Sequence, residues 1–472
     1  MMENMSGMRH PREDFWVALE NIKYAFTKLF SMRGYQFVET PLIEQTELFN
    51  RKGGGELISQ MYSFLDPDGK AVSLRPEFTS SIVKWCVDNI DDLQLPLRLQ
   101  YAGPVFRHGA INRASPQFYQ FGLELLGSDH PKSDSEILSL ACAGLSNIGH
   151  QAVQLVLGDI GVYHQLLNSF KLSQREQAFV LRNISNLRNG SEGFNKTINN
   201  AKESGLLEGD NYIGEKLEGL DKIDPQYLAA LLSELSKEYR SDALGQRSPE
   251  EVAAGLLRKS MRGSDSGKLE QALIVTAELA VIRGKPEEAL NDAYELFRQR
   301  GMKSFALDGI SDIIRLLRIA DSGSNPLIID FGLIRDISYY TGIVFEILDE
   351  KSGVSLAGGG RYDGLAMVLG SKVMIPALGF AYDLDAICKV LEGDKNAAQK
   401  EDNSPVLIIP KSLEMQEAAE SLIKRLILEG KVVELEVMDR SVSDSLLYAR
   451  NRGFNMVIEV VENGELKRHD LK

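Results

Sequence analysis

The sequence predicts an α+β fold in which an antiparallel sheet is flanked by helices, with a helical insert and a small C-terminal α/β domain. Strand-like segments in the first third of the chain occur in pairs joined by turns or polar loops. A long middle stretch carries Leu and Ala at helical spacing, and the last segment alternates strands with helices. A chain of 472 residues is also too long for one ordinary domain.

Residues 1–160 are predicted to form the first part of the sheet domain. The N-terminal helix has apolar residues at helical spacing and stops at Gly34. The residues Asp66, Pro67 and Gly69 have the chemistry of a turn, which predicts a hairpin. We expect helices at about residues 11–33, 79–87 and 134–148, and strands at 35–41, 61–65, 71–75, 97–105, 118–126 and 154–158.

The rest of the chain divides by composition. Residues 161–320 predict a mostly helical insert without a motif, and residues 321–392 return to strand patterns, beginning with a strand at 327–331. Residues 393–404 are polar and charged, which predicts a linker. Strands alternate with helices over residues 405–472, which predicts a small parallel α/β domain.

The stretch LAGGGRYDGL, residues 356–365, is the strongest local signal, together with IRDISYYTGIVFE at 334–346. Three consecutive glycines at 358–360 allow a positive φ and a close approach of the backbone to a ligand. Two neighbouring strands would then direct hydroxyls and charges into one pocket, including those of Arg361, Tyr362 and Asp363. The alternative is a hairpin whose glycines form a tight turn and whose tyrosines pack.

Two earlier segments combine carboxylates and arginines with strands. One is LRPEFT at 74–79, and the other comprises residues 103–107 and 117–124. Alternation places Gln120, Gly122 and Glu124 on one face of their strand. A glutamine and two carboxylates can hold an ammonium group, while an arginine and tyrosines can hold a carboxylate. Singly, each of these groups is more often a surface pair or a satisfied buried group.

These segments resemble motifs of a known family. PLRLQYAGPVFR with QFYQFGLELLG resembles the second signature motif of class II aminoacyl-tRNA synthetases in its histidyl form, and RGYQFVETPLIEQTELF resembles the first, dimer-forming motif. SYYTGIVFE and AGGGRYDGL resemble the two histidine-specific motifs of histidyl-tRNA synthetase, and residues 405–472 resemble its anticodon-binding domain. The resemblance implies a class II synthetase-like sheet of six antiparallel strands with a histidine site, in a homodimer.

Carried over by position, the resemblance gives each residue of the histidine site a role. Glu77, Gln120 and Glu124 would bind the amino group and the imidazole. Arg107 would hold the α-phosphate or the carboxylate, and Arg335 would help to activate the carboxylate. The full predicted histidine-binding set is Glu77, Thr79, Arg107, Gln120, Glu124, Arg335, Tyr339, Tyr340 and Tyr362.

The part that would bind ATP departs from the synthetase pattern. Gly109 stands where the motif has the glutamate that reads adenine, and only Arg113 remains of the basic residues in the following loop. Ala386 replaces the arginine of the third motif, and Asp383 adds a carboxylate nearby. Losing one such cation costs on the order of several kcal/mol of transition-state stabilisation. Ser338, in place of an aspartate, is a further departure.

A histidine site without ATP machinery resembles the regulatory subunit of ATP phosphoribosyltransferase, a paralogue of histidyl-tRNA synthetase. That resemblance implies no catalysis by this chain, no cofactor and no metal. It also implies histidine as ligand and a homodimer that partners the short-form catalytic phosphoribosyltransferase in a larger hetero-oligomer. Two features disagree with the resemblance to the regulatory subunit. Arg335 is retained, and that family usually lacks an anticodon-like domain.

Two alternatives remain open. The first is a divergent histidyl-tRNA synthetase, which would use ATP and magnesium, bind tRNA and employ Arg107 and Arg335 in catalysis. The second is a synthetase-like binding protein with no role in the histidine pathway. Three widely spaced cysteines, the lack of a secretory signal and the lack of a long apolar run predict a cytoplasmic protein without membrane association. The net charge of −14 is only weak evidence against a nucleic-acid partner.

Overall fold

The structure is a computed structural model that describes residues 13–51, 55–109, 115–207, 266–320, 326–334, 339–395, 405–412, 415–429, 431–438, 440–461 and 465–471. The chain divides into two compact units, Met1–Val390 and Leu391–Lys472. Arg113, Arg335, Ser338 and most of the predicted linker lie outside the described residues. The helices in the described parts of the chain include none long and apolar enough to cross a membrane.

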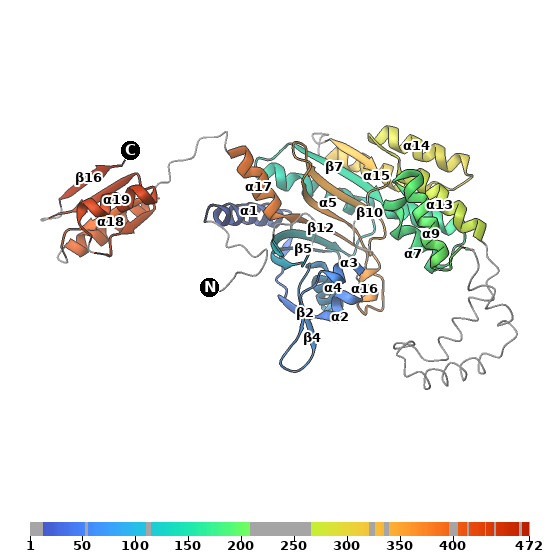
Figure 1. The fold of residues 1–472 in the computed structure, drawn as a ribbon, viewed down its shortest axis with the longest axis horizontal. Coiled ribbons are helices and arrows are strands. Elements are labelled where there is room, and N and C mark those ends of the chain that lie inside the picture. Colours follow the sequence, from blue (N-terminus) through green and yellow to red (C-terminus); the bar gives the residue numbers. More distant parts are fainter. Residues whose placement is uncertain are drawn as a thin grey trace. The chain divides into compact units, whose positions relative to one another are not determined.

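A nine-stranded sheet forms the centre of the first unit, in the order β1-β5-β6-β12-β11-β10-β7-β9-β8 (Figure 1). Its middle six strands, from β5 to β7, are all antiparallel, as the resemblance implies. In contrast, β1 is parallel to β5 and β9 is parallel to β7, while β8 is antiparallel to β9. The sheet is therefore mixed rather than wholly antiparallel. In chain order, the strands are β1 (Gln36–Phe37), β5 (Leu97–Phe106), β6 (Gln117–Leu126), β7 (Val153–Asp159), β8 (Arg283–Gly284), β9 (Leu327–Asp330), β10 (Ile343–Asp349), β11 (Ser355–Arg361) and β12 (Ala377–Asp383).

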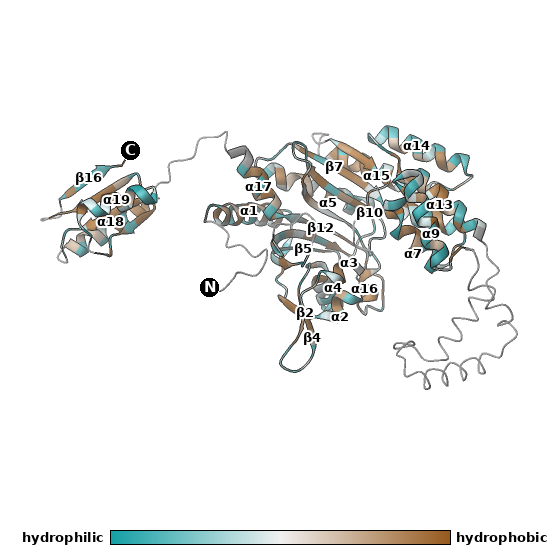
Figure 2. Ribbon diagram, in the orientation of Figure 1, coloured by the Kyte–Doolittle hydropathy of each residue, from teal (hydrophilic) through white to brown (hydrophobic). Residues whose placement is uncertain are grey.

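Aromatic side chains join one face of this sheet to the helices α1 (Glu13–Ser31) and α5 (Pro131–Asn147). The ring centroid of Phe26 in α1 lies 5.4 Å from that of Phe121 in β6 and 4.5 Å from that of Tyr382 in β12. The Tyr382 hydroxyl donates to the carbonyl of Ala141 in α5 at 2.7 Å. In Figure 2 the strands of the sheet are mainly brown, which agrees with their burial between other elements. Aromatic packing therefore fills this face of the sheet, while a second buried cluster that includes Phe78, Tyr101 and Tyr362 lies on the opposite face.

Most of the remaining helices of the first unit form two groups, one with a small second sheet and one from the predicted insert (Figure 1). Beside β5, a three-stranded sheet of order β2-β4-β3 contains the predicted hairpin, with Gly69 of its turn at φ +79°. Here lie β2 (Ile43–Gln45), β3 (Ser63–Leu65), β4 (Ala71–Leu74), α2 (Thr46–Asn50), α3 (Gly55–Ser59), α4 (Thr79–Asp88) and α16 (Leu365–Val368). The predicted insert supplies α6 (Ile160–Ser169), α7 (Gln174–Arg182), α8 (Ile184–Leu187), α9 (Gly190–Glu203), α13 (Ser266–Ala280), α14 (Pro286–Gln299) and α15 (Phe305–Ala320).

Two sequence expectations about local structure were wrong. The strand expected over residues 35–41 pairs only at Gln36 and Phe37. The glycines at 358–360 neither form a turn nor take a positive φ, because they lie inside β11, and the hairpin turns instead at Gly353, with φ +69°. A Cβ at Gly359 would lie 2.5 Å from the Cβ of Phe380 on β12. These glycines therefore permit close approach of side chains and strands rather than a bend.

The second unit has a four-stranded sheet of order β14-β13-β15-β16. The first three strands pair in parallel, as expected, but β16 is antiparallel to β15, so the domain is mixed rather than parallel. Its strands are β13 (Val406–Pro410), β14 (Val433–Leu435), β15 (Met456–Val460) and β16 (Leu466–Asp470), and its helices are α18 (Gln416–Leu428) and α19 (Val442–Arg452). The helix α17 (Leu384–Lys395) extends three residues into the predicted linker.

Candidate functional site

Small residues line the face of the central sheet that lies opposite α5. The register aligns Glu124 of β6 with Gly379 of β12, and Gly379 with Gly360 of β11. Residues directly opposite one another in a sheet project from the same face. The adjacent row on this face contains Tyr101, Gly122, Ala381 and Gly358. These small residues leave room for larger side chains that lie over them: the Tyr101 ring covers Gly122, and the Tyr340 ring covers Gly360.

Glu124 is the centre of the site. It is 1% exposed, and its Oε1 accepts hydrogen bonds from the Thr79 hydroxyl at 2.7 Å and from the Tyr101 hydroxyl at 3.4 Å. The Tyr362 hydroxyl donates to the other oxygen, Oε2. Three hydroxyl donors thus compensate the loss of hydration of one buried carboxylate.

Three tyrosines from the two histidine-like motifs pack beside Glu124. The Tyr339 ring lies 4.9 Å from that of Tyr340 and 5.5 Å, edge to face, from that of Tyr362. Burial raises the pKa of Tyr339 and Tyr362 well above the ordinary value, and the charge of Glu124 raises both further. These phenols therefore remain protonated hydrogen-bond donors at any physiological pH.

Glu77 brings a second buried carboxylate to the site. It is 5% exposed, and it accepts the backbone N–H of Ser80 in the first turn of α4 at 3.2 Å. Its negative charge acts on the hydroxyls of Tyr101 and Tyr339, because it raises the pKa of both. We call the set Glu77, Thr79, Tyr101, Glu124, Tyr339, Tyr340 and Tyr362 the Glu124 cluster.

The structure thus brings together six of the nine predicted binding residues. Gln120 lies on the same face, one row beyond Gly122, opposite Asp383. Arg107, just past the end of β5, donates from Nε to the Pro76 carbonyl at 2.9 Å. Arg335 lies outside the part of the chain that the structure describes.

Tyr101 is a member of the cluster that sequence reasoning missed. It is 2% exposed, and its ring stacks on Phe78 with centroids 4.4 Å apart. Its ring covers Gly122, the residue opposite it on β6. The sequence did contain a signal for this residue, because Tyr101 and Gly122 lie on two long predicted strands, where the tyrosine can face the glycine.

Arg361 does not face the cluster, contrary to the expectation that the charges of its motif line one pocket. It donates to Asp134 of α5 from Nε and Nη2, each at 2.9 Å. Neighbouring residues of an extended chain point to opposite sides, so Tyr362 and Arg361 separate at the end of β11. The arginine belongs to the structural support of the site.

The cluster can bind a small ligand that combines a cationic or N–H-bearing group with a flat ring. Two buried carboxylates attract such groups, and the aromatic faces add packing and cation–π attraction. The hydroxyls can reorient to donate or to accept, which suits a ligand with both kinds of polar group.

The corner between β12 and α17 carries two carboxylates at the other end of this face. Asp383 accepts the backbone N–H of Ala386 at 3.1 Å, at the start of α17. Asp385 accepts the backbone N–H of Tyr119 on β6 at 2.7 Å. A helix N-terminus favours an anion, and here the protein supplies its own. The resemblance to the third synthetase motif implies a triphosphate near this corner, and Asp383, Asp385 and Ala386 contribute no cation to hold one.

Comparison with known proteins shows to which family this chain belongs. The family model described as Histidyl-tRNA synthetase matches residues 7–200 and 229–387. The chain belongs to the histidyl-tRNA synthetase family. It is 30% identical over 438 residues to the Histidine--tRNA ligase of Methanocaldococcus jannaschii, covering 92% of this chain and 86% of that protein.

Solved structures of the histidyl-tRNA synthetase family share the fold. An ATP phosphoribosyltransferase regulatory subunit/histidyl-tRNA synthetase from Bacillus halodurans C gives a TM-score of 0.67 at 20% identity, covering 97% of this chain and 98% of that one. Histidyl-tRNA synthetase from Nostoc sp. PCC 7120 gives 0.64 at 15% identity, covering 100% and 97%. The predicted class II synthetase-like α+β fold is confirmed, while the binding role of each residue in the Glu124 cluster stays a prediction.

Proposed function

We propose that this chain is a regulatory subunit of ATP phosphoribosyltransferase. It binds histidine at the Glu124 cluster, and it activates and feedback-regulates the first step of histidine biosynthesis. It does so as a homodimer in complex with the short-form catalytic phosphoribosyltransferase. The chain itself catalyses no reaction and needs no cofactor.

The observation that carries the proposal is the β12–α17 corner. A histidyl-tRNA synthetase must bind a triphosphate carrying several negative charges and stabilise its reaction with cations. Here Ala386 contributes no charge, and the carboxylates of Asp383 and Asp385 already accept backbone N–H groups. Their negative charge opposes a triphosphate, whereas the Glu124 cluster nearby keeps the groups that suit an amino acid with an imidazole.

The proposed mechanism is a shift between two states of the dimer. Histidine contributes an ammonium group to the carboxylates of Glu77 and Glu124 and a ring to the tyrosines. A ligand can favour one state only by the difference between its affinities for the two. Histidine binding would therefore bias the surface that meets the catalytic subunit toward the inhibited state.

The test is reconstitution with a short-form catalytic phosphoribosyltransferase from the same genome. The catalytic chain alone should have low activity, and addition of this chain should raise it. Histidine should then inhibit the mixture, and inhibition should be lost with the Glu77→Ala variant of this chain. Unchanged activity on mixing, with no complex in size-exclusion chromatography, would exclude the proposal.

A second candidate, a divergent histidine–tRNA ligase, is favoured by the 30% identity to the Methanocaldococcus jannaschii enzyme over 92% of this chain. In that case Arg107 and Arg335 act on the substrate carboxylate and the α-phosphate, with ATP, magnesium and tRNA as further ligands. A single genome observation separates the candidates. A separate full-length histidyl-tRNA synthetase beside this gene favours the regulator, and its absence favours the ligase.

A further inference from the structure

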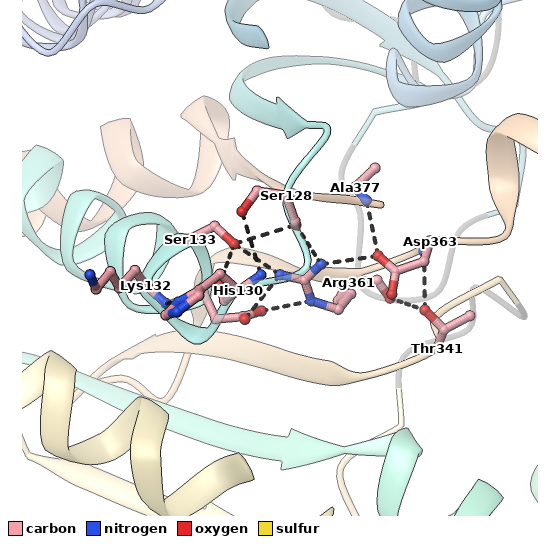
Figure 3. A network of polar contacts seen from close by, with 9 residues as sticks. Ser128, His130, Lys132, Ser133, Thr341, Arg361, Asp363 and Ala377 are labelled. Atoms are coloured by element: carbon pink, nitrogen blue, oxygen red, sulfur yellow. Dashed lines mark hydrogen bonds and ion pairs between the residues drawn. The ribbon is translucent and has the colours of Figure 1, made fainter. Parts of the chain in front are cut away.

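Arg361 stands directly behind the Glu124 cluster, and all of its donors are occupied. It is 7% exposed. Besides the two bonds to Asp134, its Nη1 donates to the Ser128 carbonyl at 2.9 Å and to Asp363 at 3.0 Å, and its Nη2 donates to the Ser133 hydroxyl at 3.1 Å (Figure 3). A guanidinium has five N–H donors. Each has an acceptor in the protein here, so the guanidinium has no N–H left for a ligand. We call Arg361 and its partners Asp134, Ser128, Ser133 and Asp363 the Arg361 joint.

Further hydrogen bonds fix the backbone on both sides of Tyr362 and on the C-terminal side of Tyr340. Thr341, next to Tyr340, donates its N–H to the Arg361 carbonyl at 2.8 Å, and its hydroxyl accepts the N–H of Asp363 at 3.0 Å. Tyr362 donates its own N–H to the Ala377 carbonyl at 2.7 Å. The Asp363 carboxylate accepts the N–H of Ala377 at 2.9 Å in return. Tyr340 lies just before the start of β10, and Tyr362 lies just after the end of β11. The hydrogen bonds of Arg361 and Asp363 connect the backbone at these two places with the start of β12.

Space around Arg361 leaves little freedom. A Cβ at Gly342 would lie 3.0 Å from the Cδ of Arg361. The guanidinium also contacts two carboxylates, those of the buried Asp134 and of the partly exposed Asp363. Buried ion pairs seldom increase stability over an apolar core of the same shape, but losing one partner is costly. Such a joint is better explained by the geometry that it imposes than by stability.

A second bidentate arginine–carboxylate pair, or fork, involves the same helix α5 and serves as a control for Arg361 and Asp134. Arg98 of β5 donates from Nε and Nη2 to Glu136 of α5, each at 2.8 Å. This pair resembles Arg361–Asp134 in geometry and lies two residues along the helix. Arg98 has Leu97 and Leu99 as its neighbours and adjoins no tyrosine of the cluster. Side-chain exposure is 34% and 21% for this pair, against 9% and 4% for Arg361 and Asp134.

We propose that Arg361 and Asp134 are positioning residues of the ligand site. They hold Tyr340 and Tyr362 in register with Glu124 and couple the site to the N-terminal end of α5. Neither residue touches the ligand. The histidine affinity of the variants rests on the proposed function, whereas their hydrogen exchange does not.

The experiment compares Asp134→Asn with Glu136→Gln, and Arg361→Lys with Arg98→Lys, in the full chain. Amide hydrogen exchange is followed for peptides that contain residues 339–342 and 361–364, and histidine affinity is measured by calorimetry. We expect Asp134→Asn and Arg361→Lys to speed exchange in both segments by at least tenfold and to weaken histidine binding about tenfold. The Arg98 and Glu136 variants should leave both readouts within twofold, even where the loss of Tm is equal.

Several outcomes decide the matter. Equal effects from both forks at equal loss of Tm would overturn the proposal, because Arg361 would then be an ordinary structural pair. If Asp134→Asn does not fold, Ser133→Ala removes one bond to Arg361, and Thr341→Val removes the bonds of its hydroxyl to Asp363 and to the Arg361 carbonyl. Both should give smaller effects in the same direction. If the unmodified protein binds no histidine, the proposed function fails, and hydrogen exchange alone still decides the role of Arg361.

Discussion

The Tyr362 hydroxyl donates to the Glu124 carboxylate, joining residues 238 positions apart in the chain across an intervening strand. The strand between β6 and β11 is β12, and Gly379 is its residue opposite Glu124. The bond is possible because Gly379 places no side chain in its way. The sheet register, the glycine and the tyrosine thus define one contact at the centre of the site.

Glu124→Gln should weaken histidine binding by about 10- to 100-fold, because a hydrogen bond to a charged group contributes roughly 1.5–3 kcal/mol. The amide is nearly isosteric, and its oxygen still accepts from Thr79. Isothermal titration at pH 7.5 measures the affinity. Glu136→Gln is the matched control on α5, with its own bidentate partner Arg98. Unchanged affinity in Glu124→Gln would remove Glu124 from the site.

Gly379→Ala should displace the Glu124 carboxylate. A Cβ there would collide with Oε2 of Glu124 and lie 2.5 Å from the Leu123 carbonyl oxygen, which belongs to the sheet backbone and cannot move freely. Overpacking of this kind typically costs about 1–3 kcal/mol of stability. We expect a lower Tm together with loss of histidine binding in calorimetry.

Gly364→Ala is the control for this change. Gly364 has φ −79°, and no atom lies within 4 Å of the position that a Cβ would take, so alanine fits there without strain. The Tm and histidine affinity of this variant should match those of the unmodified protein. A similar loss of binding in both variants would show that the effect does not come from Glu124.

Sequence patterns were sufficient for most of the sheet, because alternation and turn chemistry are local properties. Residues 97–105 and 118–126 form β5 and β6 almost as expected. The role of the glycines at 358–360 was predicted wrongly, because it does not depend on a turn in their own segment. A side chain at Gly359 would collide with Phe380, and one at Gly360 would collide with Tyr340. Tyr101 was missed and Arg361 misplaced for the same reason, since both depend on contacts between residues far apart in the chain.

Asp159 predicts a pH dependence of stability. Burial raises the pKa of this carboxyl to about 7 from the ordinary 3.8. Between these values the folded chain binds more protons than the unfolded one, so the free energy of unfolding falls as pH rises. Each pKa unit corresponds to 1.36 kcal/mol, so the fall is on the order of 4 kcal/mol.

Asp159→Asn should remove most of this fall. Asparagine remains a good N-cap for α6, where Asp159 now accepts the N–H of Gly161 at 2.6 Å. Denaturant unfolding of both proteins from pH 5 to pH 8 measures the effect, with the variant gaining relative stability toward pH 8. Parallel curves for the two proteins would mean that Asp159 titrates normally.

The central claim is that this chain recognises histidine without activating it, and ATP–pyrophosphate exchange tests it most directly. The purified protein, shown by calorimetry to bind histidine, is incubated with ATP, magnesium and labelled pyrophosphate, beside a histidyl-tRNA synthetase as positive control. We predict histidine binding with no histidine-dependent exchange above background. Robust exchange would contradict the claim and identify the chain as a histidine–tRNA ligase.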